Sequence, residues 1–229
     1  MENVTRTPGT RLMTQNIFEA FAQTINDMTL DNGYPDFTRL VNVTEIGGTK
    51  PWDIPLPVSV ADPNNDPCPA MDPFEVYHDD QVRVTAILVD HHQVFPAFAY
   101  RFDTDDGSVV FSGDTGADTN GNLEKLADGA DVLVHEVIDE SWVEQKFGET
   151  EPGTQMDALK THLLTSHTSI ADVGRVATNC TVNTLVLNHI VPGNTPVAHL
   201  QMAKGNFTGK LIIGEDLMQI GIGMAGGAS

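Results

Sequence analysis

A strand-like apolar run from Val82 to Val89 begins the part of the sequence that most restricts the fold. A second run, Ala97–Phe102, leads through the turn residues Asp105-Asp106-Gly107 into Ser108–Phe111, which predicts a β-hairpin. From there helical and strand-like segments alternate. Helices are predicted at 122–126, 169–178 with Ser169 as N-cap, and 196–204, and strands at 132–137, 185–190, 210–213 and 218–222. This order predicts an α/β fold in which helices cover a sheet.

The N-terminal part of the chain has a different pattern. The apolar spacing from Pro8 to Met28 predicts an amphipathic helix, and Val41–Ile46 predicts a short strand. Residues 51–73 contain seven prolines, so we expect an extended loop there, either a lid at a binding site or a surface insertion. With this loop inside it, the whole chain, 1–229, is predicted to form a single domain.

Charge and hydropathy exclude several classes of protein. The chain has 12 basic and 32 acidic residues, a net charge of −20, so nucleic acid is not an expected partner. No apolar run approaches the ~20 residues of a membrane span, and the N-terminus has no secretory signal pattern. A cytoplasmic location is therefore the default expectation. Two cysteines, Cys68 and Cys180, allow one disulfide and form no metal-binding pair.

Three residues with metal-binding side chains follow predicted strands. His91 follows Val82–Val89, Asp114 follows Ser108–Phe111, and His189 ends the strand at 185–190. Side chains at the carboxyl ends of strands meet at one edge of a sheet, where loops leave room for a ligand. Imidazole and carboxylate groups suit zinc, although a single histidine at a strand end is more often a structural polar residue.

Five blocks of sequence in a fixed order resemble metallo-β-lactamase-fold hydrolases, in the branch of ribonuclease Z and the arylsulfatase-like enzymes. The blocks are Asp90–Phe102, Val109–Thr115, Ala130–Glu136, Ser166–Ser169 and Leu187–Pro192. Gly214-Glu215-Asp216-Leu217 resembles the closing strand pair of that family. The resemblance implies an αββα sandwich of metallo-β-lactamase type.

The resemblance also implies a site with two zinc ions. His91, rather than its neighbour His92, resembles a ligand of the first metal, Asp114 the carboxylate that bridges both metals, and His189 a ligand of the second. His167 resembles the catalytic histidine that assists the leaving group, or stabilises developing charge, without binding metal. His135-Glu136 follows the strand-like run 132–134 and could face the site, but structural anchoring is the favoured prediction. His78, His162 and His199 are predicted to lie on the surface or on a helix face.

The family motif His-x-His-x-Asp-His is absent, although it supplies most of the metal ligands in relatives. We therefore expect an N-terminally truncated domain, and two hypotheses remain open. One is a zinc-dependent hydrolase of a small sulfate ester, phosphodiester or lactone. The other is a non-enzymatic remnant that acts as a binding or assembly module.

The spacing of the blocks bears on the substrate and on assembly. Only 22 residues separate His91 from Asp114, too few for the transfer-RNA arm that bacterial ribonuclease Z enzymes insert there. The resemblance therefore favours the small-ester branch, and it implies a homodimer.

Overall fold

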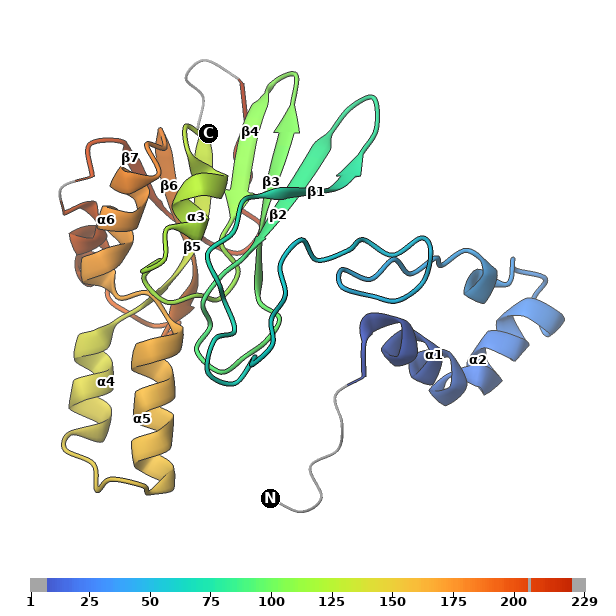
Figure 1. The fold of residues 1–229 in the computed structure, drawn as a ribbon, viewed down its shortest axis with the longest axis horizontal. Helices are drawn as coiled ribbons and strands as arrows, with labels where there is room; N and C mark the ends of the chain where they lie inside the picture. The colour runs from blue at the N-terminus through green and yellow to red at the C-terminus, as the bar shows by residue number, and fades with distance from the viewer. Residues whose placement is uncertain (1–7, 206, 224–229) are drawn as a thin grey trace. The chain divides into compact units, whose positions relative to one another are not determined.

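The computed structural model describes residues 8–205 and 207–223. The chain divides into two compact units, Met1–Pro57 and Val58–Ser229 (Figure 1). The two units are described separately. The Pro-rich segment 51–73 falls in both and forms neither helix nor strand, as predicted. None of the helices in the described ranges is long and apolar enough to cross a membrane.

The first unit is helical. The predicted helix is present as α1 (Thr10–Ala20) and α2 (Ala22–Asn26), followed by one π-helical turn, η1 (Asp27–Asp31), and later by a short 3-10 turn, η2 (Phe37–Arg39). The strand expected at Val41–Ile46 is wrong, because only Ile46 forms an isolated bridge, to Ile54. Among residues 8–57 no neighbouring strand is available to pair with the rest of that β-prone run.

A buried carboxylate holds the first unit together. The side chain of Asp53 is 1% exposed and accepts hydrogen bonds from Arg11 and from the backbone N–H groups of Glu45 and Lys50. Burial raises the pKa of Asp53, but these hydrogen bonds outweigh burial and lower the pKa to about 2. The loop that replaces the expected strand is thus fastened to α1 through Arg11.

The second unit contains a seven-stranded sheet whose strand order follows the chain, β1-β2-β3-β4-β5-β6-β7. The strands are β1 (Phe74–His78), β2 (Arg83–Leu88), β3 (Phe98–Thr104), β4 (Gly107–Phe111), β5 (Val132–Ile138), β6 (Thr184–Val191) and β7 (Lys210–Ile213). Neighbours from β1 to β4 pair antiparallel, and those from β4 to β7 pair parallel. The predicted hairpin is β3–β4. The strand expected at 218–222 is wrong, because this segment pairs with no strand in the part of the chain that the structure describes.

Helices connect the parallel strands (Figure 1). They are α3 (Asn122–Ala127), α4 (Glu140–Phe147), α5 (Gln155–Ser166), α6 (Ile170–Asn179) and α7 (Val197–Leu200), which continues as the 3-10 turn η3 (Gln201–Lys204). Ser169 caps α6 as predicted, because its Oγ accepts a hydrogen bond from the N–H of Asp172. The α/β class is therefore confirmed. The described residues contain one sheet, whereas the expected αββα sandwich has two.

The two faces of the sheet differ in exposure to solvent. Val110 and Leu133 are fully buried on a face that packs under α3 and α6. On the other face, Phe111 is 43% exposed and belongs to a groove of about 850 Å³. The groove is floored by alternate residues of β4, β5 and β6 and bordered by 214–222. Its large apolar lining residues are Val109, Phe111, Val132, Val134, Val186, Ile190, Met218, Ile220 and Ile222. Cys68 and Cys180 are both free and buried, so the disulfide that two cysteines would allow is not formed.

Candidate metal centre

The predicted site residues gather at one edge of the sheet. β2, β4 and β6 run in the same direction, because β2 and β4 both pair antiparallel with β3 and β4 is parallel to β5 and β6. His91 follows β2, Asp114 follows β4, and His189 lies near the end of β6. Their strands therefore carry them to the same rim, as the sequence predicted.

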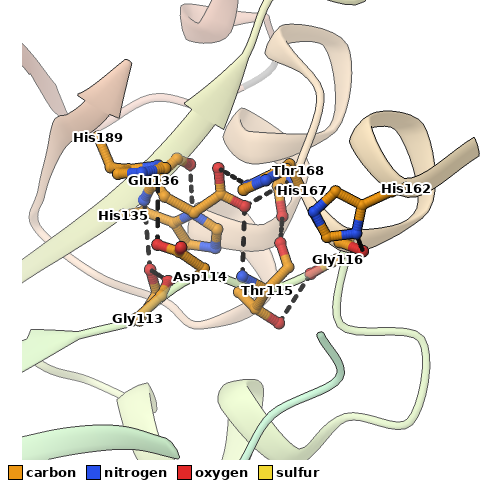
Figure 2. Close-up of polar contacts among 12 residues, drawn as sticks. Gly113, Asp114, Thr115, Gly116, His135, Glu136, His162, His167, Thr168 and His189 are labelled. Atoms are coloured by element: carbon orange, nitrogen blue, oxygen red, sulfur yellow. Dashed lines mark hydrogen bonds and ion pairs between the residues drawn. The ribbon is translucent and has the colours of Figure 1, made fainter. Parts of the chain in front are cut away.

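A β-bulge in β6 orients the side chain of His189 toward Asp114. Asn188 pairs with Glu136 and Ile190 with Val137, so His189 is an extra residue that β5 does not match. Its φ of +39° lies in the left-handed region, which a residue with a Cβ rarely adopts. Bulges of this kind redirect side chains near functional sites. Here Nδ1 of His189 lies 3.6 Å from Oδ1 of Asp114 (Figure 2).

His167 lies at the centre of the cluster. It follows α5 and precedes α6, and its ring stacks on His189 with ring centres 5.6 Å apart and an interplanar angle of 18°. The ring of His91 meets it edge-on at 5.5 Å. The structure thus brings the predicted accessory histidine into contact with two predicted metal ligands.

Two groups of side chains in the described residues have donor atoms close enough to share a metal ion. One is His91, Asp114 and His167, and the other is Glu136, His167 and His189, with donor atoms within 4.8 Å of one another in each group. Nε2 of His91 is buried and has no hydrogen-bond partner, which suits a metal-facing atom. The donor set of imidazoles and carboxylates fits zinc. His92, the rejected neighbour of His91, belongs to neither group.

Glu136 was predicted to be a structural anchor, and its two carboxylate oxygens make different contacts. The side chain is almost completely buried, and its Oε1 accepts hydrogen bonds from the backbone N–H groups of Thr168 at 2.8 Å and Thr115 at 3.3 Å. Oε2 lies 3.3 Å from Nδ1 of His167 (Figure 2). One oxygen therefore anchors two loops, while the other faces the central imidazole.

The surroundings raise the pKa of His167 and lower the pKa values of His91 and His135. The hydrogen bond and charge of Glu136 raise the pKa of His167 despite burial. Burial lowers the pKa of His91, and the nearby His167 adds to this effect. His135 is fully buried, its pKa is lowered by burial, and its Nδ1 bonds the carbonyl oxygen of Glu136. Neutral His91 is the form that can bind a metal ion.

His162, predicted to lie on a helix face, belongs to the cluster. It is half-buried on α5, and its ring centre lies 5.8 Å from that of His91 and 6.0 Å from that of His167. The other two histidines of that prediction lie outside the cluster. His78 is exposed on β1 beside Glu75, and His199 pairs with Asp139.

Comparison with curated proteins identifies relatives of the chain. It is 32% identical over 144 residues to ribonuclease Z from Mycobacterium tuberculosis (strain H37Rv), an alignment that covers 62% of this chain and 49% of the relative. With ribonuclease Z from Mycobacterium avium it is 28% identical over 205 residues, 88% of this chain and 63% of the relative. The chain thus spans about half the length of most curated relatives that it matches. No family model matches the sequence.

Solved structures align with part of the chain. A metallo-β-lactamase-fold protein from Bacillus subtilis aligns with a TM-score of 0.45 at 17% identity, covering 62% of this chain and 50% of the other. The short form of human tRNase Z aligns with a TM-score of 0.42 at 22% identity, covering 66% and 47%. The chain is thus similar in sequence to proteins named ribonuclease Z over 62% to 88% of its length.

Proposed function

We propose that the chain is a metal-dependent hydrolase that cleaves a small ester at the rim formed by β2, β4 and β6. The observation that supports this most directly is the position of Asp114. Its carboxylate belongs to a metal-capable group with His91, and it also lies 3.6 Å from His189. A carboxylate has two oxygens, so it can serve ions on both sides.

In the proposed centre His91, Asp114 and His189 would hold two zinc ions. Bound zinc would supply an activated water at neutral pH and an electrophile for the ester oxygen. His167 then donates a proton to the leaving oxygen, because the carboxylate of Glu136 stabilises its protonated form. Glu136 also fixes the ring direction of His167, since its own position is held by the N–H groups of Thr115 and Thr168.

The substrate class follows from charge and from the shape of the chain near the rim. A net charge of −20 repels a polyanion, and the stretch between His91 and Asp114 holds only β3, β4 and their turn. We therefore favour a sulfate ester, phosphodiester or lactone of low molecular weight. RNA is the second candidate, because the curated relatives are named ribonuclease Z. A chromogenic aryl sulfate, an aryl phosphodiester, an aryl lactone and a short RNA distinguish these classes.

We also infer the two-sheet sandwich, in which a further sheet covers the groove. The apolar lining of the groove by alternate residues of β4, β5 and β6 supports this inference. The same apolar face favours the alternative function, a non-enzymatic module that binds a partner or a second copy. Hydrolysis and metal content separate these functions.

The decisive experiment compares the purified chain with Asp114→Asn and, as a matched control, with Asp105→Asn in the exposed β3–β4 turn. We expect zinc in the parent protein and in the control, hydrolysis of at least one ester, and loss of both in Asp114→Asn. Absence of zinc from the parent protein, or equal hydrolysis by all three, would refute the hydrolase and leave the binding module.

A further inference from the structure

We propose that the cleft between residues 92–94 and α5 holds the leaving alcohol of the substrate, and that this alcohol is a neutral ring bearing hydroxyl groups. This inference rests on the hydrolase proposed above and names the alcohol part of its substrate, which the residues at the strand ends do not determine. The cleft has a volume of about 420 Å³. This volume lies at the lower end of the range for sites that bind small molecules, ~300–1,000 Å³.

The cleft lies beside the residues of the candidate metal centre. One wall, 92–94, directly follows His91, and the other wall includes His162 on α5. The ring centre of His162 is 6.0 Å from that of His167, the proposed proton donor (Figure 2). An alcohol that receives its proton from His167 therefore has space beside His162, in the cleft.

Hydrogen bonds fix both walls of the cleft. The N–H of Val94 donates to the carbonyl oxygen of His91 at 3.0 Å, and the N–H of His92 donates to the carboxylate of Asp90 at 2.9 Å. On the other wall, Thr154 caps the start of α5. Fixed walls lower the entropy that is lost when a ligand binds, which favours a preformed subsite.

Polar side chains line most of the cleft. Two of its side chains are apolar, Val94 and Ala158, and the others are His92, Gln93, Asp157, Thr161 and His162. A wholly apolar alcohol would cover these donors and acceptors without replacing their hydrogen bonds to water, at a cost of about 1–3 kcal/mol for each group left unpaired. Hydroxyl groups on a ring can both donate and accept, so they satisfy such a lining, while the ring itself can lie against the two apolar side chains.

The charge of the cleft excludes an anionic alcohol. No lysine or arginine is among the described residues that line it, and Asp157 is ionised, because hydrogen bonds from the N–H of Gly153 at 2.9 Å and from Oγ1 of Thr150 at 2.8 Å lower its pKa. These donors and the position of Asp157 in the first turn of α5 already balance its charge. A cation therefore gains less there than hydroxyl groups, which can use the remaining lone pairs of the carboxylate.

Esters of one acid with three matched ring alcohols test this inference. The acid is one that the full chain hydrolyses in the assay above, and the alcohols are myo-inositol, cyclohexanol and trans-4-aminocyclohexanol. We expect the highest kcat/KM for the inositol ester. In Gln93→Leu and in Thr161→Val the ratio of kcat/KM for the inositol ester to that for the cyclohexyl ester should fall at least about fivefold, since each variant loses one hydrogen bond of about 1 kcal/mol. Gln145→Leu, on the exposed surface of α4, is the control and should keep the parent ratio.

Binding of the free alcohols gives a second readout that needs no turnover. myo-Inositol and cyclohexanol are titrated into the isotope-labelled full chain, and the amide resonances are followed by NMR. We expect saturable shifts at Val94 and Thr161 with inositol only, and weaker binding of inositol by Thr161→Val. The same spectra show whether each variant is folded.

The outcomes separate this inference from the hydrolase itself. Equal kcat/KM values for the three esters, or inositol shifts that are absent from the cleft, overturn the inference and leave the hydrolase intact. Preference for the aminocyclohexyl ester overturns the neutral class in favour of a cation that pairs with Asp157. A parent chain that binds inositol in the cleft but hydrolyses no ester refutes the proposed function, and the leaving-group role with it.

Discussion

Replacement of Glu136 is expected to separate its anchoring function from its charge. In Glu136→Ala the N–H groups of Thr115 and Thr168 lose their acceptor inside the protein. A buried donor left without a partner costs about 1–3 kcal/mol, so the two amides alone predict a loss of about 2–6 kcal/mol in the free energy of unfolding. In Glu136→Gln the amide oxygen can still accept both bonds, and we expect a loss of about 1 kcal/mol from the missing charge.

The assay is urea unfolding, followed by fluorescence of Trp142 on α4 in a Trp52→Phe background so that the second unit alone is reported. Glu144→Ala, which removes a surface carboxylate with a half-exposed side chain, is the control and should cost at most about 1 kcal/mol. Equal losses for Glu136→Ala and Glu136→Gln would show that Oε1 does not hold the two loops, and the reasoning would fail.

Three further predictions concern stability. The pKa of Asp53 is lowered to about 2, so the carboxylate should contribute fully to the free energy of unfolding above its ordinary pKa of 3.8 and lose this contribution as pH falls from about 4 to about 2. Acid titration followed by Trp52 fluorescence should show this transition, and in Asp53→Asn the transition should be absent. Gly174→Ala should destabilise the chain in thermal unfolding despite the better helix propensity of alanine, because its Cβ would collide with the carbonyl oxygen of Ala203; an unchanged or higher Tm would contradict this packing. Ser169→Ala should cost about 1 kcal/mol in urea unfolding through loss of the α6 cap, and Ser169→Asp should restore it.

The strands that can be read from the sequence are those whose apolar side chains are buried by the sheet itself. Val82–Val89 predicts β2 because five of the six residues of that strand are buried. The runs at 41–46 and 218–222 have similar composition, yet neither pairs with a neighbouring strand. Strand preference records the fit to a pleated, half-buried surface, so it cannot show whether a partner strand is present.

α5 escapes prediction for a related reason. Its apolar residues do not form one buried stripe, since Met156, Leu159 and Leu164 are each at least 36% exposed. Without a stripe the periodicity that identifies helices is weak. The helix is specified by local features, its Thr154 cap and its contacts with α4.

The site residues, too, divide into those that local sequence indicates and those that only tertiary contacts place in the cluster. His91, Asp114 and His189 can be selected because each directly follows or ends a legible strand. Glu136 also lies at the end of a predicted strand, but its contacts with Thr115 and Thr168 are not visible in the sequence. The position of His162 depends on its contact with His167, which the sequence does not show either. A single sequence does not record which connection folds back over which strand.

The strict agreement between strand order and chain order has a consequence for assembly during synthesis. Each strand from β2 to β7 emerges from the ribosome when its neighbour in the sheet has already been made. The rim is completed in the same direction, with His91 first, Asp114 second and His189 last. When synthesis has reached α6, the chain already contains the first two of these residues, before the strand that brings the final imidazole exists.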